Sequence, residues 1–121
     1  MPEETLDRVA LAELLETVGG DQEFLVELIE TYLGDSPILL VDLRDGLTAG
    51  DAAAVRRAAH TLKSTSASFG ATRLATTCRE IEAAAGAEGL GALGPRVEEA
   101  AAEFEAVAAA LRAIADAGGA A

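Results

Sequence analysis

Residues 52–79 of the chain read AAAVRRAAHTLKSTSASFGATRLATTCR, and the rest of the sequence is best interpreted outward from them. This window holds the only histidine, His60, and five of the nine basic residues. It contains no acidic residue, although the chain has 21 of them and a formal net charge of −12. A basic window around a single histidine in so acidic a chain indicates a site that meets an anion.

The window has the periodicity of an amphipathic helix. At ~100° per residue, one face carries a buried seam at alternating four- and three-residue steps. The members of this seam are Val55, Ala59, Leu62, Ser66 and Phe69. The opposite face carries His60, with cations nearby and two small side chains one and two turns further on. These neighbours are Arg56, Arg57, Lys63, Ser64 and Ala67. We therefore expect His60 to point to solvent, where another macromolecule can reach it.

The run from His60 to Ala71, HTLKSTSASFGA, resembles the signature of histidine-containing phosphotransfer (HPt) domains. The resemblance covers about residues 5–115, with further similar positions at Gly19-Gly20-Asp21, Phe24, Pro37, Gly50-Asp51, Leu74 and Cys78. One position departs from the family pattern. Ser64 stands where the family usually has glycine, so access to His60 survives but a partner's backbone approaches less closely.

The resemblance implies a phosphorelay. A receiver domain of a response regulator, or a hybrid histidine kinase, would hand a phosphoryl group to His60, which would pass it to another receiver aspartate. Lys63 would steady the phosphoryl oxygens, with Arg56 and Arg57 as secondary sources of positive charge. The family often has a polar residue 22 positions after the histidine that orients the ring, and here that residue is Glu82.

The same resemblance places partner docking on the surface beyond the histidine, at Ser64, Ala67, Gly70 and Ala71. The chain would be a phosphocarrier without turnover of its own, and it would need no intrinsic cofactor. The Mg²⁺ of the reaction would belong to the acidic pocket of the receiver, because the histidine face has no carboxylate to hold a metal.

Composition limits the other possibilities. A chain of 121 residues forms one domain, and we expect residues 1–121 to be a single unit with its core over about 5–117. Cys78 is the only cysteine, so no internal disulfide and no zinc site are expected, and it is interpreted as a small core residue. The acidic charge argues against nucleic acid. With no apolar run long enough for a membrane span and no signal peptide, we expect a cytoplasmic monomer.

The fold class predicted is all-α: an up-and-down antiparallel four-helix bundle with an additional short N-terminal helix. The short helix should span about Asp7–Val18, capped by Thr5 or Asp7. The second should run from Asp21 to Gly50, and Gly34–Pro37 should either kink it or divide it into two abutting helices. The apolar stripe that continues through the interruption favours the kink. The third should run from Asp51 to Gly70 and the fourth over 72–85. After a glycine-rich loop at 86–94, the last helix should begin at Pro95 and bury Val97, Ala101, Phe104, Ala108, Leu111 and Ala115.

Some interpretations stay open at this stage. Glu82 and Lys63 can also be ordinary solvated side chains. Ser66 should bond back to its own helix. The alternative function is a helical-bundle adaptor that binds a receiver domain or another signalling partner without accepting phosphate. A kinase is disfavoured because the chain has no glycine-rich nucleotide loop.

Overall fold

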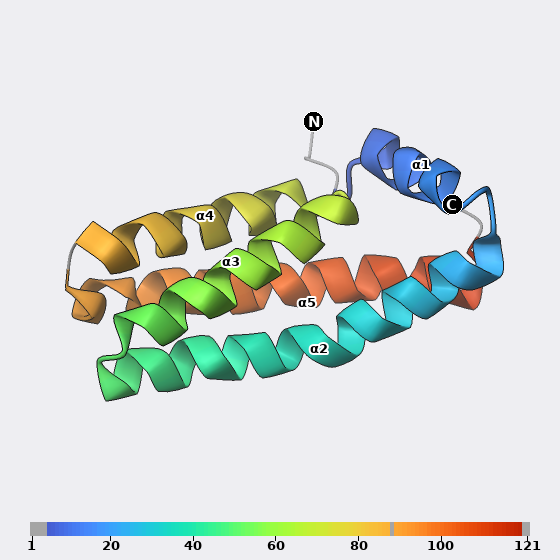
Figure 1. The fold of residues 1–121 in the computed structure, drawn as a ribbon. Coiled ribbons are helices and arrows are strands. Elements are labelled where there is room, and N and C mark those ends of the chain that lie inside the picture. The colour runs from blue at the N-terminus through green and yellow to red at the C-terminus, as the bar shows by residue number, and fades with distance from the viewer. Residues whose placement is uncertain (1–4, 88, 120–121) are drawn as a thin grey trace.

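The fold is known from a computed structural model, which describes residues 5–87 and 89–119. Its elements are α1 (Arg8–Thr17), α2 (Gln22–Ala49), α3 (Ala52–Ser68), α4 (Thr72–Ala87), the short 3₁₀ helix η1 (Leu90–Leu93) and α5 (Gly94–Asp116). The four long helices run up and down as an antiparallel bundle, and α1 lies near one end of it, beside the turn between α3 and α4 (Figure 1). The predicted fold class is confirmed. No helix in the described part of the chain is both long and apolar enough to cross a bilayer.

Helix α2 is continuous through Pro37, and its axis bends near its middle (Figure 1). This agrees with the predicted kink, because proline removes one backbone hydrogen bond without ending a helix whose apolar stripe continues on both sides. The helix begins at the Asp21 cap, whose carboxylate accepts a hydrogen bond from the Phe24 amide at 3.0 Å. It ends at Gly50, which adopts a left-handed φ of 68°.

The glycine-rich loop predicted at 86–94 is wrong in its extent. Helix α4 continues through Gly86 to Ala87, η1 occupies residues 90–93, and α5 begins at Gly94 with Pro95 in its first turn. A glycine costs only about 1 kcal/mol in a helix relative to alanine, so Gly86 near the end of α4 does not by itself stop the helix. A Cβ at Gly86 would lie 3.1 Å from a guanidinium nitrogen of Arg56.

The core follows the predicted seam of α3, which is buried at every predicted position. The seam of α5 needs a correction, since Ala101 and Ala115 are half-buried while Ala100, Val107 and Ile114 are fully inside. Cys78 is buried, and desolvation raises the pKa of its thiol to about 12, so it is a core residue with little thiolate.

Ser66 does not bond to its own helix as predicted. Its hydroxyl lies 2.7 Å from the Tyr32 hydroxyl in a buried hydrogen bond that joins α3 to α2. The Tyr32 ring is in turn packed against Phe69 and Phe104, with centroids 4.8 and 5.8 Å away. A buried tyrosine hydroxyl needs a partner, and the seam position of Ser66 supplies one.

Gly70 and Ala71 are both buried, so their assignment to a docking surface is wrong. Gly70 has a φ of 77° and accepts a hydrogen bond from the Asp7 amide at 2.7 Å. A Cβ on Gly70 would lie 2.6 Å from the Asp7 carbonyl oxygen. The glycine therefore serves the attachment of α1 to the α3–α4 turn, and its conformation follows from that contact.

This contact predicts unequal costs for two glycine substitutions. Gly50→Ala adds a Cβ in open space and should lose only the left-handed penalty of about 1–2 kcal/mol. Gly70→Ala carries the same penalty and also pushes the Asp7 backbone away, so its free energy of unfolding should fall further. Urea unfolding of both variants measures the difference, and equal losses would show that α1 is not held through Gly70.

Candidate functional site

His60 lies on the outer face of α3. The helix begins at Asp51, whose carboxylate accepts a hydrogen bond from the Ala54 amide at 3.1 Å. Ala59 and Leu62, the residues on either side of this position on the buried seam, have no exposed surface. They fix the rotation of α3, and the His60 side chain is consequently 60% exposed. Ser64 and Ala67 are exposed on the same face, as predicted.

Glu82 of α4 reaches two side chains of α3 at once. Its Oε2 lies 2.8 Å from His60 Nδ1, and its Oε1 accepts a hydrogen bond from Lys63 Nζ at 2.7 Å. The Glu82 and Lys63 side chains are 27% and 28% exposed, so this side of the site is partly shielded while the outer edge of the ring is open. The antiparallel pairing of α3 and α4 brings these residues together from positions 19 and 22 residues apart.

The contact with Glu82 sets the tautomer of the ring. An ionised carboxylate only accepts hydrogen bonds, so the proton of a neutral His60 ring lies on Nδ1. Nε2 then keeps its lone pair, and no described residue hydrogen-bonds to it. The site therefore presents a nucleophilic nitrogen to solvent in a fixed orientation.

The charge of Glu82 is favoured by its partners. The hydrogen bond from Lys63 lowers the pKa of the Glu82 carboxyl most, partial burial opposes that shift, and the hydrogen bond to His60 lowers the pKa further. Because the folded-state pKa lies below the unfolded value, these contacts stabilise the fold above the ordinary glutamate pKa and are lost on acidification. Glu82 is thus an ionised acceptor at neutral pH.

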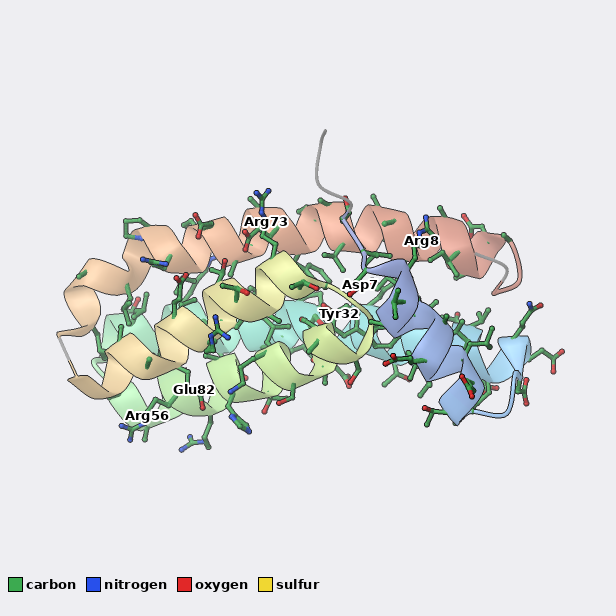
Figure 2. The ribbon with its side chains drawn as sticks, turned by 90° about the horizontal axis from the view of Figure 1, so that it is seen from above. Asp7, Arg8, Tyr32, Arg56, Arg73 and Glu82 are labelled. Atoms are coloured by element: carbon green, nitrogen blue, oxygen red, sulfur yellow. The ribbon has the colours of Figure 1, made fainter. Side chains whose placement is uncertain are left out.

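The other basic residues of the 52–79 window lie in different surroundings. Arg56 and Arg57 are exposed one turn before His60, and Arg56 lies on the same side of the bundle as Glu82 (Figure 2). Arg79, on α4, lines a groove of about 500 Å³ together with Lys63, Ser64 and Ala67. The sequence analysis assigned no role to Arg79, although its spacing of three residues from Glu82 places both on one helix face.

Arg73 does not belong to the site. It lines hollows on the α5 side of the bundle, where its charge lowers the pKa of Glu103 against a larger rise from burial. Figure 2 shows it on the side of the molecule away from Glu82. Within residues 5–87 and 89–119, no group of three or more histidine, cysteine or acidic side chains is placed to hold a metal ion.

Comparison with known proteins assigns the family. A sequence model of the Hpt domain matches residues 27–117. The structure is similar to that of histidine-containing phosphotransfer protein B (HptB) from Pseudomonas aeruginosa PAO1, with 31% identity, a TM-score of 0.82 and coverage of 95% of this chain and 97% of that one. A comparison with curated proteins found no match.

A second solved structure has the same fold at lower identity. The HPT domain of the Hpt sensor hybrid histidine kinase from Shewanella aligns with a TM-score of 0.73 and 22% identity, over 91% of this chain and 92% of that one. The chain belongs to the Hpt domain family. It is accordingly a histidine phosphotransfer protein of a two-component phosphorelay.

The tautomer imposed by Glu82 can be measured directly. The neutral side chain of free histidine favours the proton on Nε2, whereas this site holds it on Nδ1. We predict that the neutral His60 ring shows Nδ1–H in ¹⁵N nuclear magnetic resonance of the wild type and shifts toward Nε2–H in Glu82→Ala. Glu80→Ala is the matched control, since Glu80 is on the same helix but pairs with Arg96. An unchanged tautomer in Glu82→Ala would mean that the carboxylate does not determine the tautomer of the His60 ring.

Proposed function

We propose that His60 is the phosphoacceptor of this protein. It takes a phosphoryl group from the phospho-aspartate of a receiver domain, or from a histidine kinase, and passes it to the aspartate of another receiver. The observation that carries this proposal is the pairing of an exposed, unbonded Nε2 with an Nδ1 held 2.8 Å from Glu82. Family membership supports the same reaction.

The transfer needs no proton to move on this chain. Nε2 of neutral His60 attacks the phosphorus, an N–P bond forms, and the P–O bond to the aspartate breaks with its electron pair on the departing carboxylate. Nδ1 keeps its proton, so the phosphorylated ring gains positive charge. Glu82 faces that charge through Nδ1–H and stabilises it. The reverse sequence releases the group to the next receiver.

The cations near His60 supply positive charge for the incoming phosphoryl group. Lys63 is held by Glu82 at 2.7 Å, three residues and nearly one turn beyond His60, and its flexible stem lets Nζ turn from the carboxylate to the phosphoryl oxygens. Arg56 and Arg57, exposed on the preceding turn, add positive potential over the incoming anion. Together they offset the repulsion of an acidic protein toward a phosphorylated partner.

The docking surface for the receiver consists of Ser64 and Ala67, whose small, exposed side chains lie on the same face of α3 as His60. Small side chains there let the receiver bring its aspartate to within bonding reach of the ring. The Mg²⁺ of the reaction belongs to the receiver, and the chain acts as a phosphocarrier without turnover. We further propose that it works as a monomer in the cytoplasm.

Substitution of the acceptor tests the proposal against a non-phosphorylated adaptor. His60→Gln changes an exposed side chain, so the melting temperature should stay nearly unchanged, while ³²P transfer from a phosphorylated receiver should be abolished. The wild-type adduct should be lost in acid and survive alkali, as a phosphoramidate does. Arg112→Gln, an exposed change on α5, is the control and should transfer normally. Binding of the receiver with no labelling of the wild type would instead establish the adaptor.

A further inference from the structure

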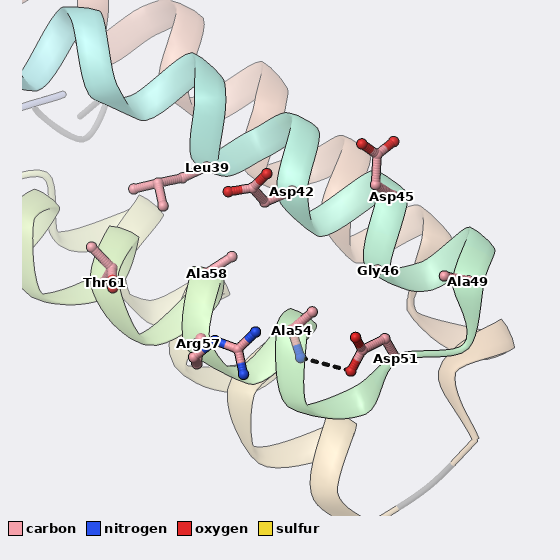
Figure 3. Close-up of a pocket in the computed structure, with 10 residues that line it drawn as sticks. All are labelled: Leu39, Asp42, Asp45, Gly46, Ala49, Asp51, Ala54, Arg57, Ala58 and Thr61. Atoms are coloured by element: carbon pink, nitrogen blue, oxygen red, sulfur yellow. Dashed lines mark hydrogen bonds between the residues drawn. The ribbon is translucent and has the colours of Figure 1, made fainter.

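A groove of about 560 Å³ runs between α2 and α3, on the flank of the histidine helix (Figure 3). Its floor is made by small residues, Gly46 of α2 with Ala54 and Ala58 of α3. Gly46 is required for this close approach, because a Cβ there would lie 2.7 Å from a Val55 methyl group. The groove is therefore a consequence of tight helix packing, and its walls are the longer side chains on either side.

The walls carry opposite charges. Asp42 and Asp45 stand on the α2 side, and Arg57 stands on the α3 side (Figure 3). Asp51 also lines the groove, but its carboxylate is engaged as the cap of α3. Asp42, Asp45 and Arg57 are exposed, and none of the three forms a hydrogen bond or ion pair with another described residue. Their charges are available to a partner.

An apolar rim adjoins the two aspartates. Ile38 and Val41 of α2 are 61% and 50% exposed, and they are two of only four large apolar residues so exposed among the described ones. Ile38 precedes Asp42 by four residues, one helical turn, so both lie on the same side of α2. The α2 wall thus combines an uncovered apolar side chain with two unpaired carboxylates.

The groove is within the footprint of a protein that docks at His60. A standard interface covers about 800 Å² on each partner, roughly 28 Å across, whereas packed helices are only 8–10 Å apart. Arg57 lies three residues before His60 on the same helix, so the groove and the histidine face are one continuous surface. A receiver centred on His60 reaches the α2 wall.

We propose that this wall selects the receiver domain: Ile38, Asp42 and Asp45 bind an apolar side chain and one or more lysine or arginine residues at the edge of the receiver's active face. The inference rests on the proposed function of His60 and deepens it. The receiver surface that fits this site carries charges of both signs. Its centre is acidic, matching the cations around His60, and its edge over α2 is basic. Receivers without that basic edge would be repelled by Asp42 and Asp45.

Charge reversal on α2 tests the selection. Asp42→Lys with Asp45→Lys should lower the second-order rate constant for transfer from a phosphorylated receiver by about tenfold at low ionic strength, mainly through weaker binding of the receiver. The loss should shrink as salt is added. Ile38→Asn should also lower this rate constant, with a loss that salt does not relieve. The matched control is Glu105→Lys with Asp116→Lys, which makes the same change in charge at exposed positions of α5 and should transfer as the wild type does.

A small phosphoramidate donor, which does not dock, separates this inference from the proposed function. It should label His60 in every variant at the wild-type rate, with circular dichroism confirming the fold. If His60 is labelled but the α2 variants and the α5 control transfer alike from the receiver, the wall does not select and the inference fails alone. If neither donor labels His60, the proposed function itself fails. A wild-type dimer that Ile38→Asn dissociates would assign the wall to a second copy and overturn the inference.

Discussion

The carboxylate of Glu82 holds the site together, because it binds His60 Nδ1 and Lys63 Nζ with its two oxygens. This one side chain thereby fixes the tautomer of the His60 ring, leaves Nε2 without a hydrogen-bond partner and holds Lys63 close to the reacting nitrogen. Lys63 also keeps Glu82 ionised, since its hydrogen bond is the largest influence that lowers the pKa of that carboxyl. The three residues form one unit in which each partner supports the state that the others need.

That unit depends on the register between α3 and α4. The buried seams of the two helices fix their rotation, and the Gly70–Ala71 turn that joins them is held against α1 through the Asp7–Gly70 hydrogen bond. The Tyr32–Ser66 hydrogen bond anchors α3 to α2 within the core. Rotating α3 by one residue would turn His60 about 100° from Glu82. The reactive geometry on the surface is therefore set by contacts that the partner never touches.

Local signals made much of this predictable from the sequence. The periodicity of residues 55–69 placed His60 outside, and Asp21, Asp51, Gly50 and Pro95 marked helix ends because capping is a short-range property. The predictions were wrong where contacts with residues distant in the sequence determine the local structure. Ser66 bonds to Tyr32 rather than to its own helix, and the start of α1 covers Gly70. Arg73 shares the basic window with His60 in sequence but faces the α5 side. The spacing of 22 residues indicated Glu82 as the partner of His60 only because the chain resembles the HPt family.

The position of the phosphoryl group on the ring tests the account most directly. Phosphorylated protein labelled with ¹⁵N at His60 can be examined by ³¹P and ¹⁵N nuclear magnetic resonance, in which the one-bond N–P coupling identifies the modified nitrogen. With Nδ1 protonated and held by Glu82, the coupling should appear at Nε2, while Nδ1 retains its hydrogen. A phosphoryl group on Nδ1 would contradict the account, because Glu82 would then occupy the nitrogen that reacts.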